Sequence, residues 1–189
     1  MIYQNFQAYS DIAGPARALA DMAAAALAHP LPGLSRNAVQ RSLAAICELV
    51  ARAGLRHRRP AFGIDGVTIQ DRRVAVRETA IHRTPFCTLL RLEKDLTAPQ
   101  PRVLLVAPMS GHFATLLRGT AQTLLADHDV YITDWHNIRD VSLHHGRFDF
   151  DDFVDHVITF LQVLEPRTHV IGVCQPCVAV LAAVAIMAE

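Results

Sequence analysis

Three short apolar runs alternate with helix-like segments in the C-terminal half of this chain. Val103 to Val106 is unbroken, and strand-like runs recur at Asp129 to Thr133 and His169 to Val173. Unbroken apolar runs are typical of strands that are covered on both faces, as in parallel sheets. Because a helical pattern follows each run, the order of elements predicts an α/β fold with a parallel sheet and flanking helices.

The intervening helices have apolar residues at helical spacing. The first carries Leu116, Leu117, Ala121, Leu124 and Leu125, and the second carries Phe153, Val157, Phe160, Leu161 and Leu164. Asp149, Asp151 and Asp152 lie near the start of the second helix, where the helix dipole favours negative charge. A third helix is expected from Cys177 to Met187.

The N-terminal part has a different pattern. Residues 11–28 predict an Ala-rich helix that Gly14-Pro15 interrupts and that Pro30 and Pro32 end. A second helix is expected from Ser35, as N-cap, to Gly54, and the basic run Arg56 to Arg59 is interpreted as a solvated linker. We therefore expect a helical segment over residues 1–62 and an α/β domain over residues 63–189.

Alternating residues predict antiparallel, half-buried strands ahead of the parallel region. After a turn at Gly63 to Gly66, Val74 and Val76 alternate with polar residues, and Phe86 to Leu92 does the same. These strands belong to the second segment.

Composition limits the function classes. The chain has 18 Lys+Arg and 18 Asp+Glu, so it lacks the basic excess of a nucleic-acid binder. Its start lacks the order of a signal peptide, and its longest uncharged apolar run falls short of the roughly 20 residues of a membrane span. We expect a soluble, cytoplasmic protein with four reduced cysteines.

One cysteine occupies a turn suited to a nucleophile. Cys174 follows the third strand-like run and precedes a helix, in the sequence Gly-Val-Cys-Gln-Pro. This resembles the G-x-S-x-G elbow of α/β-hydrolases, with Cys for Ser and Pro176 for the last Gly; Pro is accepted in a first helical turn. The helix dipole would lower the thiol pKa there. We predict Cys174 as the nucleophile.

An oxyanion hole needs two backbone N–H groups. Gln175, the residue after the nucleophile, supplies one, and the loop after the first parallel strand supplies the other from Met109 or Ser110, because Pro108 has no N–H. His112 and Trp135 are candidates for a pocket near this loop.

A family resemblance rests on four segments. These are VLLVAPMSGHFATLLRGT (103–120), DVYITDW (129–135), GRFDFDDFVDHV (146–157) and HVIGVCQPCVAVLAAVA (169–185). With the opening MIYQ and the Ala-rich helix, the chain resembles the intracellular polyhydroxyalkanoate (polyhydroxybutyrate) depolymerases. The resemblance implies a cytosolic thiol esterase that acts on stored polyester at granule surfaces through a Cys–Asp–His triad, with Cys174 as nucleophile and no cofactor.

The order of the triad raises an expectation about activity. In α/β-hydrolases the acid and the His follow the nucleophile, but no His follows His169 here. We expect an N-terminal portion of a depolymerase, in which residues 63–189 are an incomplete α/β-hydrolase domain. This domain lacks the C-terminal strands with the triad Asp and His, lacks the lid, and is expected to be inactive alone. Its open sheet edge and its apolar last helix would favour aggregation.

Other interpretations stay open. Cys174 and Cys177 match a thioredoxin-like C-x-x-C redox pair, although few residues remain for the rest of that fold. A polyester synthase-like acyltransferase also uses a cysteine elbow, and a non-catalytic granule-binding stub is a third alternative. The sequence leaves the oligomeric state and the chain-length preference open.

The remaining polar and cysteine residues have simpler interpretations. No metal site is expected at Cys174 and Cys177, which lack a second ligand pair. His144 and His145, with Asp134, Asp140, Asp149 and Asp151, are interpreted as a solvated loop. Cys47 and Cys87 are interpreted as small apolar fillers.

Overall fold

The chain forms two compact units. The computed structural model describes residues 2–28, 37–53, 59–96, 98–109, 113–164 and 166–188. The first unit is Met1–Arg58 and the second is Arg59–Glu189. The division therefore falls slightly before the boundary at residue 62 that the sequence suggests.

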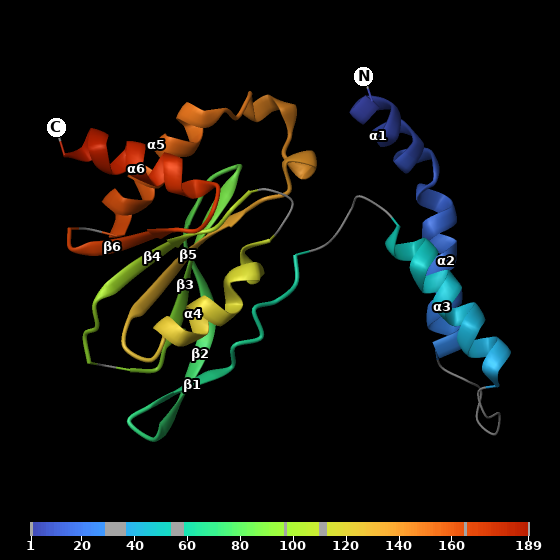
Figure 1. Ribbon diagram of the computed structural model, residues 1–189, viewed down its shortest axis with the longest axis horizontal. Helices are drawn as coiled ribbons and strands as arrows, with labels where there is room; N and C mark the ends of the chain where they lie inside the picture. Colours follow the sequence, from blue (N-terminus) through green and yellow to red (C-terminus); the bar gives the residue numbers. More distant parts are fainter. Residues whose placement is uncertain are drawn as a thin grey trace. The chain divides into compact units, whose positions relative to one another are not determined.

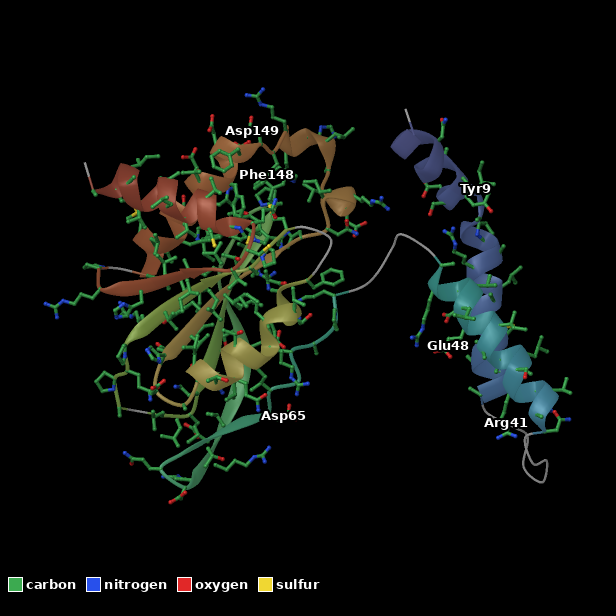
Figure 2. All side chains as sticks on the ribbon, viewed as in Figure 1. Tyr9, Arg41, Glu48, Asp65, Phe148 and Asp149 are labelled. Carbon is green, nitrogen blue, oxygen red and sulfur yellow. The ribbon has the colours of Figure 1, made fainter. Side chains whose placement is uncertain are left out.

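The described part of the first unit consists of three helices: α1 (Ile2–Ile12), α2 (Gly14–Ala28) and α3 (Ala38–Arg52). The chain breaks its helix at Ala13, before Gly14-Pro15, as expected, and α2 and α3 then pack along each other (Figure 1). Neither α2 nor α3 buries any residue, so the apolar stripe of α3, which includes Leu43 and Ile46, is exposed. Figure 2 labels Arg41 and Glu48 on the same helix.

The N-cap of α3 differs from the expected one. Asn37 caps the helix: its side chain accepts the N–H of Gln40 at 2.8 Å, and the Gln40 side chain accepts the N–H of Asn37 at 3.3 Å. This reciprocal capping box satisfies two N–H groups that the first helical turn leaves without partners. The prediction of Ser35 as N-cap is wrong; Ser35 itself and Gly54 lie outside the described residues, and α3 ends at its C-cap Ala53.

The second unit is built on a six-stranded mixed sheet of order β1-β2-β3-β5-β4-β6 (Figure 1). Its strands are β1 (Gly66–Ile69), β2 (Arg72–Arg83), β3 (Cys87–Lys94), β4 (Arg102–Val106), β5 (Asp129–Trp135) and β6 (Thr168–Gly172). The first three are antiparallel, and β3 also runs antiparallel to β5. The last three are parallel, with β4 between β5 and β6. The expected α/β class and parallel strands are confirmed.

Helices cover both faces of the sheet. The short helix η1 (Ala114–Leu117) and α4 (Arg118–Leu124) pack near β5 on one face, while α5 (Phe150–Leu164) and α6 (Pro176–Met187) pack together on the other (Figure 1). Two more short helices, η2 (Ile138–Asp140) and η3 (Leu143–His145), precede α5. Because both faces are covered, β4 from Val103 and β5 from Val130 are buried along their whole length.

Two details of the antiparallel region differ from the expectation. The turn expected from Gly63 to Gly66 is wrong: Gly63 has φ +59, but residues 61–65 form no turn and Gly66 begins β1. The turn lies at Gln70 and Asp71 instead, with φ 47 and 63. β3 was expected to be half-buried, yet Cys87 to Leu90 are all buried. The reason is that β3 lies inside the sheet, and Phe62 and Ile64 add a buried segment to the same core.

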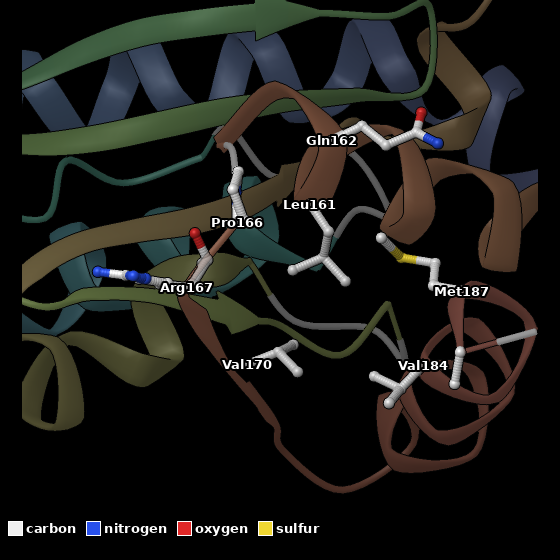
Figure 3. Close-up of a pocket in the computed structure, with 9 residues that line it drawn as sticks. Leu161, Gln162, Pro166, Arg167, Val170, Val184 and Met187 are labelled. Atoms are coloured by element: carbon white, nitrogen blue, oxygen red, sulfur yellow. The ribbon is translucent and has the colours of Figure 1, made fainter.

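The last strand and helix leave apolar surface exposed. In the described part of the chain β6 pairs with β4 alone, and α6 exposes Val178, Leu181, Val184, Ile186 and Met187. A cavity of about 560 Å³ lies between α5, α6 and the start of β6, lined by Leu161, Val170 and Met187 among others (Figure 3). None of the described helices has the length and apolar character needed to cross a bilayer.

Candidate active site at Cys174

Cys174 lies at a sharp reversal between β6 and α6. Val173 still extends the sheet, because its N–H donates to the carbonyl of Val106 at 3.3 Å. Cys174 then adopts φ +67, and Gln175 is already helical as the N-cap, with Pro176 at the start of α6. Residues other than glycine rarely adopt this left-handed backbone conformation, because it costs about 1–2 kcal/mol relative to ordinary backbone. The turn leaves the Cys174 thiol exposed.

Gly172 permits this close approach of strand and helix. A Cβ atom built on Gly172 would lie 3.1 Å from the Cα and 3.2 Å from the N of Cys177, and 3.2 Å from a methyl group of Val180. The thiol of Cys177 also donates to the carbonyl of Gly172 at 3.1 Å. The first turn of α6 is therefore packed directly on the end of β6, which fixes the position of Cys174 between them.

The loop after β4 reaches the same turn. The N–H of Met109 donates to the side-chain oxygen of Gln175 at 3.2 Å, so the structure brings these two predicted oxyanion residues together. Met109 packs its side chain against the core. Ser110 and His112, the other candidates in this loop, lie outside the described residues.

Side chains of β5 anchor the beginning of that loop. The N–H of Ala107 donates to Thr133 Oγ1 at 2.9 Å, and the carbonyl of Ala107 accepts the indole N–H of Trp135 at 2.9 Å. Both backbone polar groups of the buried residue Ala107 are thus satisfied, as burial requires. Sequence reasoning missed Thr133, whose only signal was its place on the neighbouring parallel strand.

Trp135 belongs to the core. It is 6% exposed and packs edge-on against Phe153, with ring centroids 4.6 Å apart, and against Phe148 at 5.8 Å. Phe148, labelled in Figure 2 just before α5, closes this aromatic group together with Phe86. Trp135 therefore contacts the loop after β4 through the carbonyl of Ala107, and it does not line the cavity of Figure 3.

No described histidine or carboxylate is hydrogen-bonded to the Cys174 thiol. His136 uses its ring nitrogens on Thr88 (2.8 Å) and on the carbonyl of Pro85 (2.9 Å). His156 uses its ring nitrogens on the carbonyl of Asp152 (2.6 Å) and on Thr84 (3.0 Å). His169 lies in β6, five residues before Cys174, which corresponds to roughly 16 Å along an extended strand.

Asp134 is buried, so its assignment to a solvated loop is wrong. The residue is 8% exposed, and its carboxylate forms an ion pair of 2.7 Å with Arg59, which also pairs with Glu78 at 2.8 Å. Burial raises the pKa of Asp134 above its usual value, and the nearby Arg59 charge opposes that shift. Arg59, expected in a solvated linker, therefore holds the start of the second unit on β5; residues 54–58 lie outside the described part.

The other polar residues of this region do not form a metal site within the described chain. His144, His145, Asp140, Asp149 and Asp151 are exposed, as expected for a solvated loop. Asp149 accepts the N–H groups of Asp151 (3.2 Å) and Asp152 (3.3 Å) at the start of α5, which holds its pKa below the usual value. These contacts give Asp149 a capping role.

The four cysteines have different environments and all are free thiols. Cys87 is fully buried, and burial raises its pKa well above the usual value, so this thiol is inert. Cys47 is partly buried, whereas Cys174 and Cys177 are exposed. Of these two exposed residues, Cys177 donates a hydrogen bond from its thiol to the carbonyl of Gly172.

Comparison with known protein families, curated proteins and solved structures gives no match to this chain.

Proposed function

We propose that this chain carries the nucleophile of a cysteine-dependent ester hydrolase of the intracellular polyhydroxyalkanoate depolymerase type. The observation that carries the proposal is the exposed Cys174 at φ +67, between the end of the parallel strand β6 and the start of α6. A left-handed non-glycine residue is unusual, and strain of this kind gathers at functional sites.

The chemistry of the site supports acyl transfer. The N-terminus of α6 carries partial positive charge, which favours negative charge that develops beside it when the sulfur of Cys174 attacks an ester carbon. As the sulfur bonds to that carbon, the carbonyl oxygen gains negative charge and needs N–H donors. Gln175 at the helix start and Met109 in the loop after β4 are adjacent, as their 3.2 Å contact requires. Collapse of the intermediate breaks the ester C–O bond, and the acyl group stays on Cys174.

The topology supports an α/β-hydrolase assignment. The parallel strands have the order β5-β4-β6, and the nucleophile follows the third of them along the chain. Three antiparallel strands, β1, β2 and β3, precede them along the chain, and β3 joins them to the sheet next to β5. In α/β-hydrolases the nucleophile likewise stands on a strand-to-helix turn at the carboxyl edge of the sheet.

The substrate class rests on the resemblance of residues 103–185 to the depolymerases. We propose that the substrates are polyhydroxyalkanoate chains or oligomers at granule surfaces in the cytoplasm. The acyl-enzyme must be hydrolysed by an activated water, and no described base contacts Cys174. We therefore expect Cys174 to be acylated in a single event and to turn over slowly, since loss of one triad member costs several orders of magnitude.

A burst assay with the full chain tests this. Rapid mixing with p-nitrophenyl butyrate should release about one equivalent of p-nitrophenolate, and an intact-mass shift should map to Cys174. Cys174→Ala should abolish the burst, while Cys177→Ala should retain it. A burst that persists in Cys174→Ala, or steady turnover without Cys174, would disprove the proposal.

The polymer assignment needs its own measurement. A 3-hydroxybutyrate oligomer should acylate Cys174 and so reduce the burst of p-nitrophenolate. An aliphatic ether oligomer, which has no ester bond, should leave the burst unchanged. If a hydroxyacyl-CoA acylates Cys174 and the bound acyl group grows into a polymer chain, the synthase-like alternative holds instead. Co-sedimentation with polyester granules, with and without residues 1–58, tests binding to the granule surface.

A further inference from the structure

The side chain of Gln175 occupies one of the donors that the proposed reaction needs. Its amide oxygen accepts the N–H of Met109 at 3.2 Å, on the exposed side of the turn. Gln175 also directly follows the nucleophile, so the same residue offers a backbone donor and blocks another donor with its side chain. The side chain makes no other hydrogen bond that is recorded among the described residues.

We propose that Gln175 is a built-in competitor of the substrate: its amide oxygen takes the place of the ester carbonyl oxygen at Met109 N–H until a substrate displaces it. This inference rests on the proposed function of Cys174. It assigns to Gln175 a role in regulating access to the oxyanion donor, beyond the backbone N–H expected of that position.

The chemistry of the two oxygens supports this competition. A side-chain amide and an ester both present a neutral, planar carbonyl oxygen, and both accept the same type of N–H donor. One N–H oriented at one acceptor cannot serve a second acceptor well, so the ester oxygen must displace the amide oxygen. Rotation about the Gln175 side-chain bonds is sufficient for this, because Gln175 is exposed.

The anchoring of the loop means that the donor stays in place when Gln175 leaves. Ala107, two residues before Met109, is held by hydrogen bonds of 2.9 Å to Thr133 and to Trp135. Met109 also packs its side chain on the core. The contact with Gln175 is thus not needed to hold Met109, and its removal frees the N–H for the substrate.

The size of the effect follows from the exposure of the contact. A neutral hydrogen bond that water can replace contributes modestly to a folded state, so its loss should speed acylation by roughly two- to tenfold. Gln175→Glu should act in the opposite direction. A carboxylate makes a stronger hydrogen bond to the same N–H and repels the developing oxyanion, so acylation should slow by at least about tenfold.

The test compares two reactions of Cys174 in the full chain, with Cys47 and Cys177 replaced by alanine. In the first, p-nitrophenyl butyrate acylates the thiol: the sulfur–acyl bond forms, p-nitrophenolate leaves with the electron pair, and the thiol proton passes to buffer. In the second, an aromatic disulfide exchanges with the same thiol, and no carbonyl oxygen is involved. The ratio of the two rate constants removes changes in thiol reactivity.

Gln175→Ala should raise this ratio and Gln175→Glu should lower it, while Gln122→Ala, an exposed glutamine on α4, should leave it unchanged. Amide hydrogen exchange of Met109, measured by NMR, should accelerate in Gln175→Ala. A ratio that falls or stays constant in Gln175→Ala would overturn the competitor role while the ester-hydrolase proposal stands. Absence of Cys174 acylation in every variant, with disulfide exchange intact, would overturn both.

Discussion

Gly172→Ala tests whether the nucleophile turn depends on direct packing of α6 on β6. The added methyl group would lie 3.1–3.2 Å from backbone atoms of Cys177 and from Val180. Backbone atoms at the start of a helix cannot move aside singly, so α6 must shift as a whole. Gly172 has no positive φ, so the effect is steric and not conformational.

The expected magnitude is that of an overpacked core. Insertion of one methyl group into a tight contact costs about 1–3 kcal/mol. For the second unit, Arg59–Glu189, this corresponds to a fall in melting temperature of about 3 to 10 °C. The shift of α6 should also move the Cys174 thiol relative to Met109, so acylation should slow more than disulfide exchange does.

Fluorescence provides a specific assay for this unit. The chain has a single tryptophan, and Trp135 is 6% exposed within the core of the second unit, so its emission reports the unfolding of that unit alone. Gly119→Ala is the matched control, because a methyl group there meets nothing within 4 Å, and alanine in α4 should stabilise the helix by up to about 1 kcal/mol. Equal melting of Gly172→Ala and the unchanged chain would refute the close-packing argument.

Three further changes test other contacts. Arg59→Ala leaves the Asp134 carboxylate buried without its cation, so at pH 7 we expect a loss of about 1–3 kcal/mol, measured by urea unfolding. Because burial raises the pKa of Asp134, the native state takes up its proton more readily than the unfolded chain; the loss should therefore shrink as the pH falls through that raised pKa, and a constant loss would contradict this. Cys174→Gly relieves the backbone at φ +67 and should stabilise the unit by about 1 kcal/mol, whereas Cys177→Gly inside α6 should cost about 1 kcal/mol; equal urea midpoints would refute the strain. Leu181→Glu on the exposed face of α6 (72% exposed) should change the unfolding free energy by less than about 0.5 kcal/mol but reduce self-association in light scattering, and unaltered association would show that this surface is not responsible.

The parallel part of the fold could be predicted because its signals are local. Val103 to Val106 is a strand covered on both faces, and that property shows directly as an unbroken apolar run. Pro176 at the first position of α6 and the Asp residues at the start of α5 are also local signals, and each lies where expected. The capping box of α3 was within reach as well, since Gln40 follows Asn37 at the required spacing.

The remaining features depend on residues far apart in the chain. Arg59 and Asp134 each look like solvated charges in the sequence, and only the arrangement of the sheet brings them to 2.7 Å. The same holds for Thr133 and Ala107, which are neighbours because β4 and β5 pair in parallel. The contact between Met109 and Gln175 required in addition the side-chain conformation of Gln175, for which a sequence carries no signal.

Several local rules are broken around one turn, and their coincidence carries more weight than any of them alone. Position 174 has a left-handed backbone that glycine would accept without cost, yet it carries a thiol. Gly172 has no unusual backbone conformation, but the space around it admits only glycine. The backbone N–H of Met109 donates to the side chain of Gln175, whereas most backbone N–H groups donate to backbone carbonyls. Stability alone would favour glycine at position 174, whereas presentation of a reactive sulfur on this turn requires a cysteine there. Departures from local consistency are expected at functional sites, and here they meet at Cys174.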